Sequence, residues 1–201
     1  MLKVGLTGGL ACGKTFVGEA LAALGCHVLQ ADQLGHQVLL PGGEAYAPVV
    51  REFGPGILGE NDEIDRRALA EQVFGSAERL ALLNSLVHPP VLRQEEAWLD
   101  RVAAGDPRGI AVIEAAILVE IGSHQRFDKL IVVVCEEEQQ IERSMKRDGV
   151  ERERVWERLS RQMPLSEKRK FADFIVDTSG TKEETLRQVR AVYDSLRRIE
   201  L

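Results

Sequence analysis

An eight-residue stretch near the start of the chain constrains the fold more than any other feature. Residues 8–15 match the pattern G-x-x-x-x-G-K-[ST], in which backbone N–H groups and a helix N-terminus bind phosphate. An apolar strand candidate (residues 3–6) precedes the motif, and apolar residues at helical spacing follow it up to Leu24. This order predicts a phosphate-binding loop, made of Gly8, Gly9, Leu10, Ala11, Cys12, Gly13, Lys14 and Thr15.

The last two residues of the motif carry its chemistry. We expect Lys14 to reach the β- and γ-phosphates of a nucleoside triphosphate and the Thr15 hydroxyl to ligate Mg²⁺. Cys12 is interpreted as a small residue at a small-residue position, the alternative being a redox or metal role. The cysteines at positions 12, 26 and 135 show no C-x-x-C spacing, so we expect no disulfide framework, no Cys-based zinc site and a reducing cytoplasm.

Four more apolar runs read as strands, and helical patterns separate them. The runs are continuous rather than alternating, which is typical of parallel strands covered on both faces. A final helix is predicted over 181–201 and opens with the pattern of a capping box, Thr181 to Glu184. We therefore predict an α/β fold of three layers with a five-stranded parallel sheet. The further strand candidates are 26–30, 109–114, 130–135 and 174–176, and the further helices are 32–40, 46–53, 66–74 and 76–100.

The helical stretch between the second and third strands is far longer than a crossover needs, which predicts an inserted helical subdomain. A second insertion, between the fourth and fifth strands, is strongly charged: residues 143–170 hold ten Lys or Arg and five Asp or Glu. The whole chain has a net charge of −6, without the basic character of a nucleic-acid-binding protein. Its longest apolar run, residues 130–135, is far shorter than the roughly 20 residues of a membrane span.

The loop motif indicates nucleotide binding and leaves the reaction open. The N-K-x-D base reader of a GTPase is absent, and a helicase would need a longer chain and a basic surface. These exclusions favour a small-molecule kinase. A nucleotide-dependent binding or regulatory module is the alternative from another class.

The order of the motifs resembles the dephospho-CoA kinase family over nearly the whole chain. Residues 5–15, Gly-Leu-Thr-Gly-Gly-Leu-Ala-Cys-Gly-Lys-Thr, are similar to the family's G-L-T-G-G-I-G-S-G-K-S, and Gln30-Ala31-Asp32 is similar to its D-A-D. The other matches, in family order, are Pro41-Gly42, Phe53-Gly54, Ile64-Asp65-Arg66, Leu83-Asn84, His88-Pro89, Ile117-Leu118-Val119-Glu120, Gln140-Ile141-Glu142-Arg143, Arg147-Asp148, Arg158, Gln162 and Ala172-Asp173.

The resemblance implies a P-loop kinase fold in three parts. Residues 1–31, 101–139 and 172–201 would form the nucleotide-binding core, residues 32–100 a helical coenzyme-binding insertion and residues 140–171 a lid. It also implies that ATP, with Mg²⁺, phosphorylates the ribose 3′-hydroxyl of dephospho-CoA. The alternative within the enzyme class is a nucleoside-monophosphate kinase or another small-molecule kinase with the same core. Such an enzyme would be cytoplasmic, a monomer or small homo-oligomer, with no nucleic-acid or membrane partner.

Family position assigns the site residues. The catalytic set would be Asp32, Lys14 and Arg143, with Asp32 accepting the hydroxyl proton. Nucleotide would be bound by the loop with Arg147 and Asp177, and substrate by Asp32, Arg66, His88, Glu120 and Arg158.

Other interpretations of these residues are structural. Asp32 precedes a helical pattern and would also serve as a helix N-cap. The arginines of 143–170 would also suit a solvated helix face paired with glutamates. Glu120 would orient either the substrate or neighbouring lid groups, and Arg66 and His88 each have a structural role as the alternative.

Three positions depart from the family pattern. Gln30 replaces the first Asp of D-A-D, so a second carboxylate beside Asp32 is missing. Ala116 stands where the family usually has Pro, and Asp177 where Asn is usual after the last strand. A carboxylate cannot donate a hydrogen bond as an amide does, which bears on the contact to adenine.

Overall fold

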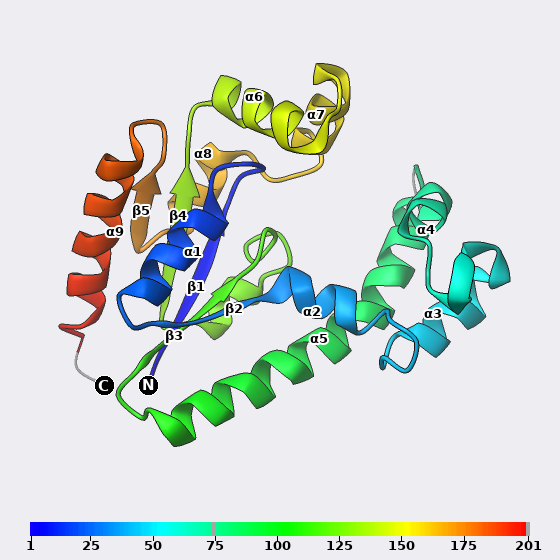
Figure 1. Ribbon diagram of the computed structural model, residues 1–201, viewed down its shortest axis with the longest axis horizontal. Helices are drawn as coiled ribbons and strands as arrows, with labels where there is room; N and C mark the ends of the chain where they lie inside the picture. Colours follow the sequence, from blue (N-terminus) through cyan, green and yellow to red (C-terminus); the bar gives the residue numbers. More distant parts are fainter. Residues whose placement is uncertain (74, 200–201) are drawn as a thin grey trace. The chain divides into compact units, whose positions relative to one another are not determined.

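The computed structural model describes residues 1–73 and 75–199 (Figure 1). The chain divides into two compact units, one made of Met1–Gln30 with Arg101–Leu201 and the other of Ala31–Asp100. Residues 140–171 belong to the first unit, and their action as a lid stays a prediction. Within the described ranges, no helix has the length and apolar character that crossing a membrane requires.

The first unit is built on one parallel sheet with the strand order β2-β3-β1-β4-β5. All five predicted strands form, each within two residues of its expected ends, and the α/β prediction is confirmed. Because the strands are parallel, their carboxyl ends share one edge of the sheet, where the predicted phosphate loop follows β1. The strands are β1 (Leu2–Gly8), β2 (His27–Gln30), β3 (Ile110–Glu114), β4 (Lys129–Val134) and β5 (Phe174–Asp177).

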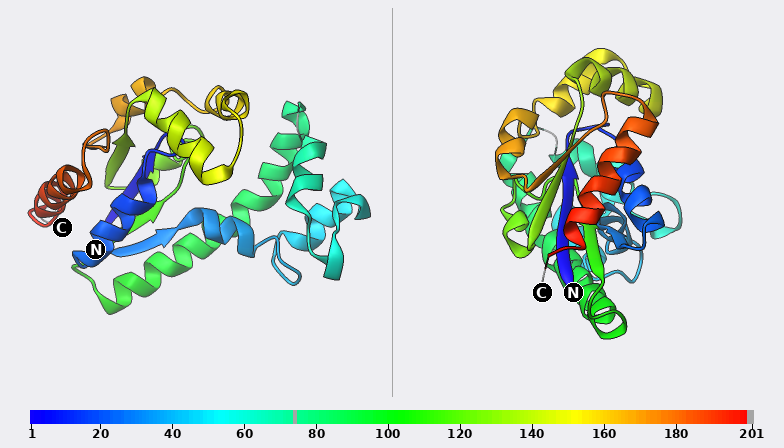
Figure 2. Two further views of the ribbon diagram at one scale, coloured as in Figure 1. Left: turned by 45° about the horizontal axis from the view of Figure 1, so that its top comes forward. Right: turned by 90° about the vertical axis from the view of Figure 1, so that its left-hand side faces the viewer.

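Helices and loops cover both faces of the sheet. Val4 and Leu6 alternate toward one face, in a hydrophobic cluster with α1 (Lys14–Ala23) and α9 (Lys182–Leu196), two helices that lie side by side in Figure 2. Gly5 and Thr7 face the other way: a Cβ on Gly5 would lie 2.9 Å from the Phe127 ring, and the Thr7 hydroxyl donates to the carbonyl of Ala116. This two-sided coverage completes the three predicted layers.

The charged segment between β4 and β5 is mostly helical. The chain leaves β4 into α6 (Glu137–Asp148) and α7 (Arg152–Leu159), and returns to β5 through α8 (Leu165–Lys168) and a 3₁₀ turn, η4 (Arg169–Phe171). The last helix begins with the predicted capping box, in which Thr181 and Glu184 exchange hydrogen bonds. That helix ends at Leu196, earlier than expected, and the two final residues lie outside the described part of the chain.

The second unit is helical and has its own core. Val49, Phe53, Ile57 and Leu69 are among its buried residues. The helix expected over 32–40 ends at Gln37, where the chain turns. The helix expected over 66–74 begins at Arg66, and its expected end at Phe74 lies outside the described residues. The helix α5 (Ala77–Gly105) runs past its predicted end at residue 100, and most of it belongs to this unit. The 3₁₀ turn η3 (Ser123–Arg126) belongs to the first unit. The other elements of the second unit are α2 (Ala31–Gln37), α3 (Tyr46–Phe53), η1 (Pro55–Ile57), η2 (Glu60–Asp62) and α4 (Arg66–Val73).

Candidate active site

The loop after β1 has the backbone of a phosphate cradle. Gly8 ends the strand so close to β4 that a Cβ there would lie 2.3 Å from the carbonyl oxygen of Val133. Gly13, at φ 81°, is the N-cap of α1, and Ala11 also takes a positive φ of 53°. The loop therefore curls back on itself and leads into the first turn of α1, and the N-terminus of a helix favours an anion.

Two side chains at the start of α1 carry the polar groups predicted for the loop. The Lys14 ammonium donates to the carbonyl of Gly9 at 2.9 Å. The Thr15 hydroxyl donates to a carboxylate oxygen of Glu114 at 3.0 Å. A hydroxyl and a carboxylate in contact beside a phosphate-binding loop are oxygen groups of the type that Mg²⁺ prefers, so these residues fit the ion that the kinase prediction requires.

Glu114 is a site residue that the sequence analysis missed. It is the last residue of β3, the strand beside β1, and it is only 7% exposed. A carboxylate that ends an otherwise apolar strand was the available signal. Its pairing with Thr15 depends on the strand order, which brings residues 99 positions apart together.

An ion pair lies under the loop between Glu120, which was a predicted site residue, and Lys168, which the sequence analysis missed. The Lys168 side chain is fully buried and its ammonium lies 2.7 Å from Glu120. The same ammonium donates to the carbonyls of Ala116 at 2.8 Å and Gly8 at 3.4 Å. Lys168 therefore links α8, the segment after β3 and the first residue of the phosphate loop.

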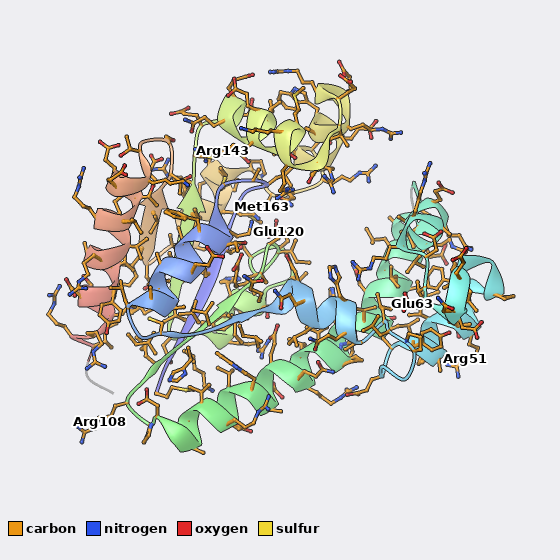
Figure 3. The ribbon with its side chains drawn as sticks, viewed as in Figure 1. Arg51, Glu63, Arg108, Glu120, Arg143 and Met163 are labelled. Atoms are coloured by element: carbon orange, nitrogen blue, oxygen red, sulfur yellow. The ribbon has the colours of Figure 1, made fainter. Side chains whose placement is uncertain are left out.

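Glu120 also holds the start of the segment that leads to α8. Its carboxylate accepts a hydrogen bond from the backbone N–H of Met163 at 3.3 Å, and both residues are labelled in Figure 3. These contacts give Glu120 a positioning role beside the loop, and its predicted contact with substrate stays a prediction. Ala116 contributes through its carbonyl, which a proline at this position would also present.

Arg143 is the one arginine of the predicted site that is anchored to the core, among the described contacts. Its guanidinium extends from α6 and donates to the hydroxyl of Thr178 at 3.1 Å and to the carbonyl of Thr178 at 2.8 Å. The Thr178 hydroxyl in turn donates to the carbonyl of Cys12, inside the phosphate loop, at 2.8 Å. Thr178, which the sequence analysis did not single out, thus connects Arg143 to the loop.

Arg147 and Arg158 share a surface carboxylate instead. Both donate to Asp148, from α6 and α7 respectively, with Arg147 contacting both carboxylate oxygens at 2.8 and 3.0 Å. The hydrogen bonds from Arg147, followed by those from Arg158, lower the pKa of Asp148 to about 2. Both arginines are more than half exposed, so their predicted contacts with nucleotide and substrate stay predictions.

Asp177 ends β5 and organises the turn that follows. Its carboxylate accepts from the backbone N–H of Ser179 at 2.8 Å, while the Gln188 amide bonds both to its N–H and to its carbonyl. It borders an open hollow of about 530 Å³. Its predicted contact with adenine stays a prediction. The hollow is lined by Asp177, Ser179, Gly180, Glu184, Arg187, Gln188 and Ala191.

A second cavity, of about 470 Å³, lies between the phosphate loop and the segment from α7 to α8. Gln140 is 5% exposed, and a Cβ on Gly9 would come within 2.6 Å of its amide oxygen. The loop therefore borders a cavity with both polar and apolar walls. The lining residues are Gly9, Cys135, Glu137, Gln140, Trp156, Leu159, Ser160, Gln162, Met163, Pro164, Leu165 and Ser166.

Three predicted site residues lie in the second unit, and the catalytic role of Asp32 and the contacts of all three with substrate stay predictions. Asp32 is exposed and lies inside the first turn of α2, so its interpretation as the N-cap is wrong: the helix begins one residue earlier. Arg66 is exposed at the start of α4, where Asp65 accepts from two backbone N–H groups. His88 is half-buried in α5, and burial lowers its pKa.

Comparison with known proteins decides the family. The profile of the dephospho-CoA kinase family matches residues 2–184. The chain belongs to the dephospho-CoA kinase family. The dephospho-CoA kinases of Aquifex aeolicus and Geobacillus kaustophilus are 40% and 39% identical to it, over 98% and 95% of this chain and 99% and 94% of theirs. Family members are ATP-dependent kinases that transfer phosphate to an alcohol.

Solved structures agree on the fold. A crystal structure of a Thermus thermophilus protein superposes with a TM-score of 0.85 at 33% identity and covers 97% of both chains. A dephospho-CoA kinase from Campylobacter jejuni matches at a TM-score of 0.65 and 24% identity, over 96% of both chains. A shikimate kinase from Acinetobacter baumannii matches at 0.51 and 14% identity, over 100% of this chain and 96% of its own. The last two show the fold alone, which is that of the P-loop kinases.

Proposed function

We propose that this protein transfers the γ-phosphoryl group of ATP to the ribose 3′-hydroxyl of dephospho-CoA, giving CoA and ADP. The observation that carries the proposal is the phosphate loop with its Thr15–Glu114 contact at the carboxyl edge of the sheet. Family membership over nearly the whole chain supports the choice of acceptor. The loop amides and the N-terminus of α1 would hold the β- and γ-phosphates.

Mg²⁺ would be held by Thr15, with Glu114 accepting from the Thr15 hydroxyl or from a water on the ion. The bound ion supplies charge neutralisation on the β- and γ-phosphates. Glu114 is buried, so its carboxylate is held in one place rather than left to sample solvent.

Lys14 and Arg143 would stabilise the charge that spreads over the transferred group. Phosphoryl transfer needs positioned cations rather than covalent chemistry from the protein. Arg143 meets this requirement because its guanidinium is held by Thr178. The hydroxyl of Thr178 also donates to the Cys12 carbonyl in the loop. Arg147 would join them at the nucleotide by exchanging its surface carboxylate for phosphate.

Asp32 would accept the proton of the 3′-hydroxyl as the oxygen attacks the γ-phosphorus and ADP leaves. Its carboxylate is exposed and has no hydrogen bond or ion pair among the described residues, so it is available to a substrate hydroxyl. Arg66, His88, Glu120 and Arg158 would contribute to the binding of dephospho-CoA, as family position implies.

The test is Mg²⁺-dependent ADP release from ATP by wild type and Asp32→Asn. Dephospho-CoA is compared with AMP, adenosine and shikimate as acceptors. We expect stimulation by dephospho-CoA alone, and a fall in kcat of roughly 10²–10⁴-fold in the variant, because general-base assistance is lost.

Near-normal turnover by Asp32→Asn would remove Asp32 as the base and leave the activity standing. Equal slow hydrolysis with every acceptor would contradict the kinase proposal. That result would favour a nucleotide-dependent binding module with the same fold.

A further inference from the structure

Two of the three cysteines meet beside the phosphate loop. The sulfur atoms of Cys12 and Cys135 lie 3.2 Å apart, although the residues are 123 positions apart in the chain. Cys12 belongs to the loop that would hold ATP, and Cys135 follows the last residue of β4. Both are buried, with 0% and 9% of their surfaces exposed. The proposed phosphoryl transfer uses neither sulfur.

The two thiols differ in their access to small molecules. Cys135 lines the 470 Å³ cavity, together with Gly9 and Gln140. Cys12 lies deeper, inside the curl of the loop: a Cβ on Gly9 would be 2.9 Å from its sulfur. A small reactant that enters the cavity therefore meets Cys135 first, with Cys12 directly behind it.

The electrostatic surroundings point the same way. The hydrogen bond with Cys12 is the largest cause that lowers the pKa of Cys135, and the nearby Arg143 charge lowers it further, against the effect of burial. The same thiol contact, followed by burial, raises the pKa of Cys12. Cys135 is thus the thiol that ionises more readily, and a thiolate is the nucleophilic form.

We propose that Cys12 and Cys135 are a modification site for hydroperoxides, and that their oxidation to a disulfide reversibly disables the phosphate loop. The Cys135 thiolate attacks a peroxide oxygen, so that an S–O bond forms, the O–O bond breaks and water or an alcohol leaves after protonation. The Cys12 sulfur then attacks the sulfur of the resulting sulfenic acid, the S–S bond forms, the S–O bond breaks, and the hydroxide leaves as water with the Cys12 proton. Each disulfide consumes one hydroperoxide, and a dithiol reductant reverses the change.

The disulfide would distort the loop because the sulfurs must move closer. A disulfide places its sulfurs about 2.05 Å apart, so the present 3.2 Å separation must shrink by about 1.1 Å. Gly8 and the Cys12 carbonyl are held in the loop by Lys168 and Thr178, so the loop cannot shift as a rigid body. A misplacement of about 1 Å at a catalytic site can cost on the order of 10²-fold in rate, which is the loss we expect on oxidation.

Cys26 provides an internal control. It is buried in the same hydrophobic cluster, and burial raises its pKa to about 12. A buried thiol of this kind is inert toward peroxide. If peroxide oxidised buried cysteines in general, Cys26 would be oxidised as well. If the reaction depends on the contact between two thiols, Cys26 stays reduced.

The experiment treats the folded, full-length protein with hydrogen peroxide, stops the reaction with catalase and divides each sample. One part is mapped for disulfide-linked peptides by mass spectrometry under non-reducing conditions. The other is assayed for affinity toward an ATP analogue and for phosphorylation of dephospho-CoA, before and after dithiothreitol. Wild type is compared with Cys135→Val, which removes the reactive thiol, and with Cys26→Ala.

We expect a Cys12–Cys135 linked peptide in wild type and in Cys26→Ala, with weaker nucleotide binding that dithiothreitol restores. Cys135→Val should keep its nucleotide affinity at the same peroxide dose. The inference is overturned if no Cys12–Cys135 link forms in wild type, if the link forms with unchanged nucleotide affinity, or if Cys135→Val loses affinity equally. Peptide mapping of wild type decides the chemistry even if Cys135→Val fails to fold.

The regulatory part of the inference rests on the proposed use of ATP by this loop. The two can fail separately, because the disulfide map and the nucleotide affinity do not depend on the acceptor. A reduced enzyme that is inactive toward dephospho-CoA but forms the link would contradict the proposed function and leave the thiol pair in place.

Discussion

The charged groups under the phosphate loop and those on α6 and α7 differ in burial, and burial decides what each set can do. Under the loop, Lys168 is fully buried and has three partners, two on the segment after β3 and one in the loop itself. On the helices, Arg147 and Arg158 share Asp148, and Arg152 pairs with Glu138. Both regions contain ion pairs, but the Lys168 ammonium also donates to two backbone carbonyls, whereas these surface pairs join side chains to side chains.

Exposed pairs exchange partners at little cost. A solvent-exposed ion pair contributes about 0–1 kcal/mol, because water and salt compensate each charge. A buried charge that loses its partner has no such compensation. The comparison indicates that the loop is held in advance of nucleotide binding, whereas the surface arginines are free to re-pair with phosphate.

Breaking the buried pair should give the largest effect. Lys168→Met leaves the Glu120 carboxylate beside the loop without its cation, and we expect a loss of about 3–5 kcal/mol in the free energy of unfolding. Urea denaturation measures this. Lys170→Met is the matched control, since Lys170 pairs with Glu167 on the exposed surface two positions away.

The double variant Lys168→Met/Glu120→Leu sharpens the result. Removing both charges should recover part of the lost stability, because a buried ion pair can often be replaced by apolar groups without net cost. Equal destabilisation by Lys168→Met and Lys170→Met would break the contrast between the two regions.

The second prediction concerns Glu114. Glu114→Gln keeps the size of the side chain but removes the charge beside Thr15. We expect kcat to fall about 10²–10³-fold, as when one preorganised electrostatic partner of a transition state is lost, with a higher Mg²⁺ requirement. Steady-state kinetics across a Mg²⁺ titration measure both, with the exposed Glu138→Gln as control. If the Mg²⁺ dependence of Glu114→Gln equals that of wild type, Glu114 does not help to hold the ion.

The third prediction compares two arginines. Arg143→Lys loses the paired hydrogen bonds to Thr178, each of which involves a charged donor and is worth about 1.5–3 kcal/mol. If the transition state loses the stabilisation of one such hydrogen bond, kcat falls by about 10- to 100-fold. Arg152→Lys, on the exposed helix, should leave kcat within error of wild type. Similar losses in both variants would mean that the anchoring by Thr178 is irrelevant.

The smallest effect is expected at Asp148. Its folded-state pKa of about 2 lies below the ordinary value of 3.8. A carboxyl whose pKa is lower in the folded state than in the unfolded state stabilises the fold at any pH above its unfolded-state pKa. This contribution is lost as the pH falls from about 4 toward 2. Because the pairs are at the surface, we expect no more than about 1 kcal/mol.

Thermal unfolding of wild type and Asp148→Asn between pH 2 and pH 7 tests this. The difference in stability should be present at neutral pH and shrink steadily as the pH falls from about 4 toward 2. A larger difference at low pH than at pH 7 would contradict the assignment.

The sequence was sufficient for the fold because local patterns specify it. Continuous apolar runs located all five strands, and the glycines and Lys14 located the loop. The ends of helices were less certain: α5 continues to Gly105, although it contains Pro89 and Pro90. The helix that follows β2 begins at Ala31, so Asp32 lies within it rather than capping it.

The supporting residues were missed because their partners are distant in sequence. Lys168 lies in a run of exposed charges, and nothing local marks it as the one that meets Glu120. Thr178 and Glu114 become informative only once the strand order places them next to the loop. Cys12 was interpreted as a small residue of the loop and Cys135 as a buried, inert thiol, and their contact follows from the pairing of β1 with β4.

The most direct test of the account is the identity of the product. Wild-type protein is incubated with ATP, Mg²⁺ and dephospho-CoA, and the product is analysed by mass spectrometry and ³¹P NMR. The account predicts a gain of one phosphoryl group as a monoester on the ribose 3′-oxygen, identical to authentic CoA, with one ADP formed per product. Phosphate on any other atom, or ADP formed without a phosphorylated acceptor, would contradict it.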